Sequence, residues 1–361
     1  MEQIKILPLF FIFFIFPALG HNDYTPFYHL GEDLYDSNGK VINAHGGGIT
    51  NYNNTFYWYG EYREKKGPVK KGFSLYSSSD LIHWDNRGVV FDINKNQSLS
   101  NGDIQSGAIF ERPKVIYDKN TKKFLMFFHF ERKGEGYKSA LIGLATSILP
   151  EGPFEYIRSF RLNANTLPHG INDINQVEKG SRFKHDYHDG QMSRDLNVFI
   201  DTDSSVYLVS ASENNSTLII TKLTKDLMHL DKFFVRVAPG GYNEAPILFR
   251  KNNFYYLITS GTSGWVPNQA RLFMAKSIEG HWSYIGSPVI SLSEQDVKTT
   301  FYSQGAFVTR YKGTDYFVAD RWNQADLSAS KYIWIPIKWS YDIPKLTIKK
   351  HNDDFNNVGE H

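Results

Sequence analysis

Acidic or amide side chains recur at one position of a repeated unit in this chain. They stand near the start of one short, strand-like segment in successive units: Glu111, Asp195, Glu244 and Gln304. In the first unit, Ala44 and His45 hold the corresponding position. A repeat has a structural reason to reuse its strands, but none to place carboxylates at the same edge of each one. Converging acids on a rigid scaffold therefore indicate a catalytic or ligand-binding centre.

Three carboxyl groups around one pocket suit the hydrolysis of a glycosidic bond. One carboxylic acid must stay protonated to donate to the leaving oxygen, while a partner activates water or stabilises the transition state. A nearby carboxylate raises the pKa of the acid, because two adjacent groups do not readily ionise together. The alternative is that the acids form salt bridges with Arg112 and Arg194, which stand beside two of them. Three acids at equivalent positions favour a catalytic site over salt bridges.

An aromatic-rich segment follows each of these polar positions and is typical of a second strand. These segments occupy 56–60, 124–128, 206–210, 254–258 and 316–320. Turn-forming residues precede each segment, as in β-hairpins. Each unit contains four such strands, and no run of ten or more residues after the first twenty has a helical period. We therefore expect an all-β fold, a five-bladed β-propeller with four antiparallel strands per blade. A β-sandwich is the alternative.

The innermost strand of each propeller blade lines the central channel, so the polar positions are expected to meet around the axis. His45 is a candidate substrate-binding residue that would line this channel or touch an ion, but a plain hydrogen-bonded histidine is the favoured alternative. The glycines at 46–48 are expected to let the inner strand pack closely near the axis. The polar segment 161–190 has weak strand signals, and we interpret it as a long loop at the rim of a binding face.

The first twenty residues are typical of a secretory signal peptide. A charged start precedes an apolar run from Ile6 to Phe16, and small residues follow at 18–20. The apolar run is shorter than the roughly 20 residues that a membrane span needs. We expect no membrane insertion, removal of residues 1–20, a secreted or periplasmic location, and a single catalytic domain over 21–361. The absence of cysteine excludes disulfides.

The charge and composition limit the partners of the chain. A net charge of +2 argues against nucleic acid, and we expect a monomer. No cofactor or metal ion is expected to be required, although a calcium or sodium ion in the central channel is compatible with the pattern. The HDYHDG segment at 185–190 has metal-like spacing, but on so polar a loop it is more often solvated. The basic segment 65–71 is interpreted as a solvated loop, with contact to an anionic glucuronate as the alternative.

The chain resembles glycoside hydrolase family 43 in segments that span nearly all of it after residue 20. They are INAHGGGI (42–49), YWYGEY (57–62), ERPKVIYD (111–118), SRDLNVFID (193–201), SASENNSTL (210–218), NEAPILF (243–249), TSGTSGW (259–265) and SQGAF (303–307). Within the family it is most similar to the exo-β-1,3-galactanase branch, whose members remove galactose from the β-1,3-galactan backbone of arabinogalactans. The resemblance implies a five-bladed propeller, an inverting mechanism, and a galactan or arabinogalactan oligosaccharide as substrate.

The resemblance also implies roles for individual residues. Glu244 matches the general acid, and Asp195 matches the carboxylate that tunes the acid and orients the sugar. Family members usually carry an aspartate base where this chain has Ala44 and His45. The galactanase branch shares this gap, and a glutamine matching Gln304 is proposed there to position the water. Further residues match positions of the sugar pocket: Glu61, Glu111, Tyr137, Thr262 and Trp265.

Two other functions remain compatible with the sequence. An α-L-arabinofuranosidase or β-xylosidase of the same family is one, although the missing aspartate base and the GTSGW segment favour galactose. A catalytically inactive sugar-binding propeller is the other. The absent base supports this reading, whereas the presence of Glu244, Asp195 and Glu111 together argues against it, because a lectin needs no acid with a tuned pKa.

Overall fold

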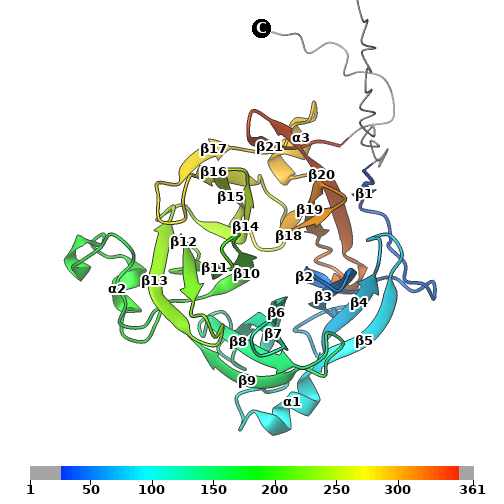
Figure 1. Cartoon of the computed structure of the whole chain (residues 1–361), viewed down its shortest axis with the longest axis horizontal. Coiled ribbons are helices and arrows are strands. Elements are labelled where there is room, and N and C mark those ends of the chain that lie inside the picture. Colours follow the sequence, from blue (N-terminus) through cyan, green and yellow to red (C-terminus); the bar gives the residue numbers. More distant parts are fainter. Residues whose placement is uncertain (1–25, 349–361) are drawn as a thin grey trace, which may run out of the picture.

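Five antiparallel sheets surround a central axis in the computed structural model, which describes residues 26–348 (Figure 1). Four sheets contain four consecutive strands each, and the last sheet also takes in a strand from the N-terminal end of the described chain. The five-bladed propeller predicted from the sequence is confirmed. The predicted signal peptide, residues 1–20, lies outside the described residues.

Each blade begins with the strand nearest the axis. The inner strands are β2 (His45–Tyr52), β6 (Ile109–Asp118), β10 (Arg194–Ile200), β14 (Asn243–Lys251) and β18 (Gln304–Tyr311). The second strands are β3 (Thr55–Glu61), β7 (Lys123–Glu131), β11 (Val206–Ser212), β15 (Phe254–Gly261) and β19 (Thr314–Arg321). All five aromatic-rich segments lie in second strands, as predicted. The outer strands are β4 (Gly72–Ser78), β5 (Asp85–Asp92), β8 (Leu141–Ser147), β9 (Glu155–Phe160), β12 (Thr217–Leu223), β13 (Leu230–Val237), β16 (Arg271–Ala275), β17 (Ser283–Gly286) and β20 (Lys331–Ser340).

The fifth blade is completed from both directions of the chain. Strand β1 (His29–Leu30) pairs with β20 at Ile333 and Trp334, whereas β21 (Ile343–Leu346) pairs with the far half of β20. The outer position of the fifth blade is therefore shared by a strand that ends at residue 346 and a strand near residue 30. Pairing both segments with one strand closes the ring of blades.

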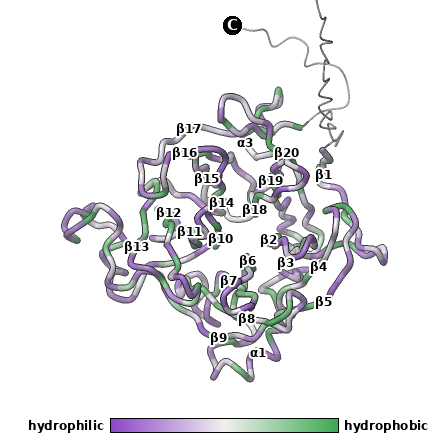
Figure 2. Tube along the Cα trace, viewed as in Figure 1, coloured by the Kyte–Doolittle hydropathy of each residue, from purple (hydrophilic) through white to green (hydrophobic). Residues whose placement is uncertain are grey.

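Apolar side chains fill the spaces between neighbouring blades. Trp58 of the first blade and Trp334 of the fifth are both fully buried and pack edge to face with ring centroids 5.4 Å apart. Figure 2 shows hydrophobic and hydrophilic residues interspersed along the strands. The second strands are buried along nearly their whole length, since each has one strand on either side and a blade against each face. This burial accounts for their aromatic composition.

Helices are short and lie outside the sheets. They are α1 (Ile93–Leu99), α2 (Arg182–His185) and α3 (Glu294–Thr299), with single 3-10 turns at Ile174–Gln176 and Leu327–Ala329. The low helix content predicted from the lack of a 3.6-residue period is confirmed. Within residues 26–348, no helix is both long and apolar enough to cross a membrane.

The long segment 161–190 packs on the outside of the ring. It projects beside β13 and carries α2 (Figure 1). Leu162, Val177 and Phe183 are buried in a cluster with apolar side chains of the second and third blades. The prediction that this segment lies at the rim of the binding face is wrong, because none of its residues lines the pocket described below. It packs against the second and third blades instead.

Candidate active site

A pocket of about 320 Å³ opens where the inner strands begin. Residues from all five blades line it: Glu61, Arg63, Glu111, Arg112, His129, Tyr137, Arg194, Asp195, Asn215, Glu244, Gly264, Trp265, Gln304 and Trp322. Most of the site residues predicted from the sequence meet here: Glu244, Asp195, Gln304, Glu111, Glu61, Tyr137 and Trp265. A larger cavity of about 1220 Å³ at the opposite ends of the inner strands contains none of these residues.

Every inner strand carries a bulge or irregularity near its start. The pairing with the second strands makes five positions equivalent: His45, Glu111, Arg194, Glu244 and Gln304. Asp195 is one residue further on and has a left-handed φ of 50°. Placing it in register with the other acids was therefore wrong by one residue. A one-residue shift in a regular strand would turn a side chain to the other face, but the bulge re-aims Asp195 toward the pocket.

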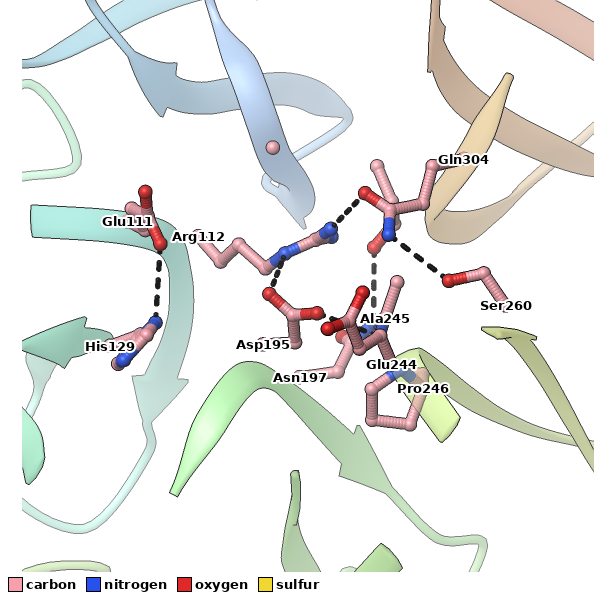
Figure 3. Close-up of polar contacts among 12 residues, drawn as sticks. Glu111, Arg112, His129, Asp195, Asn197, Glu244, Ala245, Pro246, Ser260 and Gln304 are labelled. Atoms are coloured by element: carbon pink, nitrogen blue, oxygen red, sulfur yellow. Dashed lines mark hydrogen bonds and ion pairs between the residues drawn. The ribbon is translucent and has the colours of Figure 1, made fainter. Parts of the chain in front are cut away.

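The carboxyl groups of Asp195 and Glu244 lie next to each other across two blades (Figure 3). Asp195 Oδ1 accepts a hydrogen bond from Arg112 Nε, and its Oδ2 accepts one from the backbone amide of Ala245, each at 2.9 Å. Burial and the charge of Asp195 raise the pKa of Glu244 to about 7, although a hydrogen bond from Asn215 opposes this shift. Glu244 thus holds a proton under conditions in which an ordinary glutamate is ionised, as a general acid requires.

The amide of Gln304 is held by three side chains. Its Oε1 accepts hydrogen bonds from Arg112 Nη2 at 2.8 Å and from Trp322 Nε1 at 3.1 Å. Its Nε2 donates to Ser260 Oγ at 3.0 Å. Two donors thus saturate the oxygen, and one Nε2 proton has no partner among the described residues. Gln304 can therefore hold a water molecule as a donor, whereas its oxygen is not free to accept a proton from that water.

Glu111 is surrounded by donors. Tyr137 donates its hydroxyl proton to Glu111 Oε1 at 3.0 Å, Arg63 Nη2 lies 3.2 Å from the same oxygen, and His129 Nδ1 lies 3.3 Å from Oε2. Burial disfavours the ionised carboxylate, but His129 and Arg63 outweigh it and hold the pKa of Glu111 at about 2. Glu111 is consequently an ionised acceptor for hydroxyl groups and a weak base.

The carboxylate of Glu111 contacts His129, which in turn contacts the buried carboxylate of Glu131. His129 Nε2 lies 2.8 Å from Glu131 Oε1, and Glu131 is fully buried. Burial favours neutral His129, but hydrogen bonding to Glu111 and Glu131 raises its pKa to about 9. The imidazolium thus lies between two carboxylates and stabilises the negative charge of Glu111.

Arg63 joins the acidic and the aromatic sides of the pocket. It forms ion pairs with Glu61 and Glu111, and its guanidinium lies 5.6 Å from the ring of Trp265 and 5.7 Å from that of Trp322. Burial raises the pKa of Glu61 to about 7 in spite of Arg63. The arrangement places two indole rings beside hydrogen-bonding groups, the combination that binds the apolar face and the hydroxyl rim of a sugar.

Two predicted pocket residues do not line the pocket. His45 is fully buried behind it, with Nδ1 3.1 Å from Asp320 Oδ1 and its ring stacked on Tyr332. The favoured reading of His45 as a hydrogen-bonded histidine describes it, and His45 is not among the residues that line the pocket. Thr262 is exposed on the loop after β15, and only Gly264 and Trp265 of that loop reach the pocket.

The glycines after His45 are required by close packing. A Cβ atom on Gly47 would lie 2.0 Å from the carbonyl oxygen of Tyr59, and one on Gly60 would lie 2.1 Å from the carbonyl carbon of Ala44. No side chain fits either position, since both clashes involve the backbone. The predicted close approach of the first inner strand is confirmed.

Both histidines and the first aspartate of the HDYHDG segment have protein partners. Asp186 is buried and forms ion pairs with Arg161, Arg182 and His185, while His188 is hydrogen bonded to Asn165. Across residues 26–348, no three His, Cys, Asp or Glu side chains gather where they could hold a metal ion.

Sequence reasoning missed several residues of the pocket: Arg63, Arg112, His129, Arg194, Asn215 and Trp322. The two arginines beside the acids were considered only as partners of those acids. Arg112 instead pairs with Asp195 of the next blade, and Arg194 donates to the backbone oxygen of Tyr137. The local sequence could not reveal this, because both contacts cross between elements far apart in the chain.

Comparisons with known proteins agree with this geometry. The model of the family described as glycosyl hydrolases family 43 matches residues 177–342. The GH43 β-1,3-galactosidase BT3683, solved with galactodeoxynojirimycin, is 36% identical with a TM-score of 0.84, covering 90% of this chain and 99% of that one. The exo-β-1,3-galactanase of Phanerochaete chrysosporium, solved with galactose, is 30% identical with a TM-score of 0.73, covering 88% of this chain and 66% of that one.

A more distant relative carries a different activity in its name. The β-D-galactofuranosidase xynD of Aspergillus niger is 22% identical over 248 residues, which are 68% of this chain and 64% of that protein. The chain thus spans about two thirds of the length of the fungal relatives.

Proposed function

Because the chain belongs to glycoside hydrolase family 43, we propose that it releases galactose from the ends of β-1,3-linked galactan and arabinogalactan oligosaccharides. The observation that carries this proposal is the pairing of Glu244 with Asp195, which keeps one carboxyl group protonated beside an anionic partner. The names of two similar solved proteins, a β-1,3-galactosidase and an exo-β-1,3-galactanase, support the choice of linkage. A pocket of about 320 Å³ suits the binding of one terminal sugar.

In the proposed reaction, Glu244 transfers its proton to the glycosidic oxygen as the bond from that oxygen to the anomeric carbon breaks. Asp195 keeps Glu244 protonated before this step, and its charge favours the positive transition state. Water attacks the anomeric carbon from the opposite face of the sugar as that bond breaks and then releases one proton to solvent, so that the product has the inverted anomeric configuration. Gln304 orients this water through its free Nε2 proton. Glu111 binds hydroxyl groups, since a carboxylate with a pKa of about 2 is a weak proton acceptor.

We further propose that the protein is secreted or periplasmic, on the strength of its N-terminal twenty residues, and that it acts as a monomer. The scheme needs no cofactor, and a calcium or sodium ion in the channel would serve structure alone.

The test is hydrolysis of β-1,3-galactobiose by the wild type and by Glu244→Gln, followed by NMR of the released galactose. We expect α-galactose as the first product, and a loss of about 10²- to 10⁴-fold in kcat/KM for the variant. First formation of β-galactose would contradict inversion, and full activity of Glu244→Gln would contradict the role of Glu244.

Other substrates separate the competing functions. β-Xylosides, α-L-arabinofuranosides and β-D-galactofuranosides are assayed in parallel, and faster turnover of any of them would replace the proposed substrate. Binding of galactan oligosaccharides without any turnover would identify a sugar-binding propeller instead.

A further inference from the structure

The hairpin turn between β11 and β12 reaches back to the acid of the next blade. Three successive residues of this turn have left-handed backbones, with φ of 53° at Glu213, 56° at Asn214 and 66° at Asn215. Asn215 Nδ2 donates a hydrogen bond of 2.6 Å to Glu244 Oε1, and the backbone oxygen of Asn215 accepts one of 2.9 Å from the amide of Asn243. The turn therefore contacts the start of β14 through both side chain and backbone.

The direction of the side-chain bond restricts where a proton can sit on Glu244. A protonated carboxyl group has one carbonyl oxygen and one hydroxyl, and an amide nitrogen can only donate. Because the carbonyl oxygen is the stronger acceptor, the bond from Asn215 favours Oε1 as the carbonyl oxygen and Oε2 as the oxygen that carries the proton. Arg194 Nη1 lies 3.4 Å from Asn215 Oδ1, so a donor faces the amide oxygen and the amide nitrogen faces Glu244.

We propose that Asn215 is a positioning residue. It keeps the transferable proton of Glu244 on Oε2, so that this oxygen donates to the leaving group. This rests on the proposed role of Glu244 as general acid. Asn215 acts through Glu244 by fixing which oxygen donates.

The turn is itself held by the segment that packs outside the ring. Glu213 is buried, and its carboxylate accepts hydrogen bonds from Arg236 Nε at 2.7 Å, Ser181 Oγ at 2.8 Å and the backbone amide of Phe183 at 3.3 Å. Arg236 also pairs with Glu178 at 2.9 Å. Part of the segment 161–190 thus reaches the active site indirectly: it holds Glu213, and the turn of Glu213 presents Asn215.

The pH dependence follows from the charges around Glu244. Asp195 disfavours ionisation of Glu244, whereas Arg112, Arg194 and the hydrogen bond from Asn215 favour it. Removal of the Asn215 donor therefore raises the pKa of Glu244, and the alkaline limb of activity moves to higher pH. The rate falls nonetheless, because the carboxyl group of Glu244 is no longer held with its protonated oxygen toward the leaving group.

The experiment compares two substrates whose leaving groups differ in their need for a proton. β-1,3-Galactobiose needs protonation of the departing oxygen, whereas β-D-galactosyl fluoride releases fluoride without it. For Asn215→Ala we expect a fall of about 10- to 100-fold in kcat/KM on galactobiose, a part of what general acid catalysis supplies, with fluoride hydrolysis unchanged and the alkaline limb shifted upward. Glu213→Gln is expected to show the same pattern to a smaller extent. Asn120→Ala, in the distant β6–β7 turn, is the matched control.

Three outcomes decide the matter. Equal losses on both substrates in Asn215→Ala, or no loss on galactobiose, would overturn the positioning role. Glu244→Gln serves as the reference, since it should lose galactobiose cleavage and keep fluoride hydrolysis. If Glu244→Gln instead retained galactobiose cleavage, the proposed function itself would fail. Failure of the Asn215 proposal alone differs from this, because Glu244→Gln would then still lose galactobiose cleavage.

Discussion

The carboxylate of Asp195 accepts a 2.9 Å hydrogen bond from the backbone amide of Ala245, the residue that follows Glu244. This bond ties the bulge of the third blade to the bulge of the fourth and fixes an anion beside the acid. Arg112 holds the other oxygen of Asp195, so the anion remains paired while it acts on Glu244. The electrostatics of the pair therefore depend on the geometry of two bulges.

Activity on galactobiose should fall as the pH rises through about 7. The active form of Glu244 is the protonated one, and its pKa is raised to about 7 by burial and by Asp195. A profile of kcat/KM against pH measures this fall, the alkaline limb of activity. The same limb should be absent with β-D-galactosyl fluoride. An alkaline limb near the ordinary glutamate pKa of about 4.3 would contradict the assignment.

Asp195→Asn should move the alkaline limb to lower pH. The substitution removes the negative charge that disfavours ionisation of Glu244, so the pKa of Glu244 falls and the acid loses its proton earlier. This shift is opposite to the one expected for Asn215→Ala. The pH profile of each variant provides the measurement. Asp203→Asn, on the exposed turn after β10, should retain the wild-type profile, and an upward shift in Asp195→Asn would argue against the like-charge effect.

Arg63→Met should destabilise the fold strongly. Glu61 and Glu111 both pair with Arg63 in a buried setting, and removal of one partner from a buried ion pair costs about 3–5 kcal/mol. The free energy of unfolding in urea is the measurement. Arg87→Met removes an exposed arginine that pairs with Asp85 and should cost at most about 1 kcal/mol. Equal effects of the two substitutions would show that Arg63 does not stabilise the buried acids.

Trp265→Ala should weaken substrate binding and leave the acid unchanged. The indole lines the pocket beside Trp322 and offers an apolar face to a sugar. We expect KM for galactobiose to rise about tenfold, equivalent to about 1.4 kcal/mol, with the alkaline limb in its wild-type position. Trp282→Ala, whose indole donates to the oxygen of Ile278 away from the pocket, is the control. A shifted pH profile in Trp265→Ala would mean that the ring influences Glu244 directly.

Much of the fold was predictable because propeller strands repeat along the chain. The aromatic composition of the second strands identifies them in the sequence, and this composition follows from burial on both faces. The outer position of the fifth blade was not predictable in full, since β1 has only two residues and pairs with a strand some 300 residues later in the chain. Local sequence patterns carry no signal for so distant a pairing.

The sequence by itself determined that Glu111, Glu244 and Gln304 share one position of a five-fold repeat, because a hairpin repeat places equivalent residues at the same end of every blade. Only the tertiary structure decided how they are used. The bulge at Asp195 re-aims its side chain, and Arg63, Arg112 and Asn215 reach their partners across blade boundaries. Bulges and contacts between blades depend on the closed ring, in which residues far apart in the chain share one buried volume with strong electrostatic coupling.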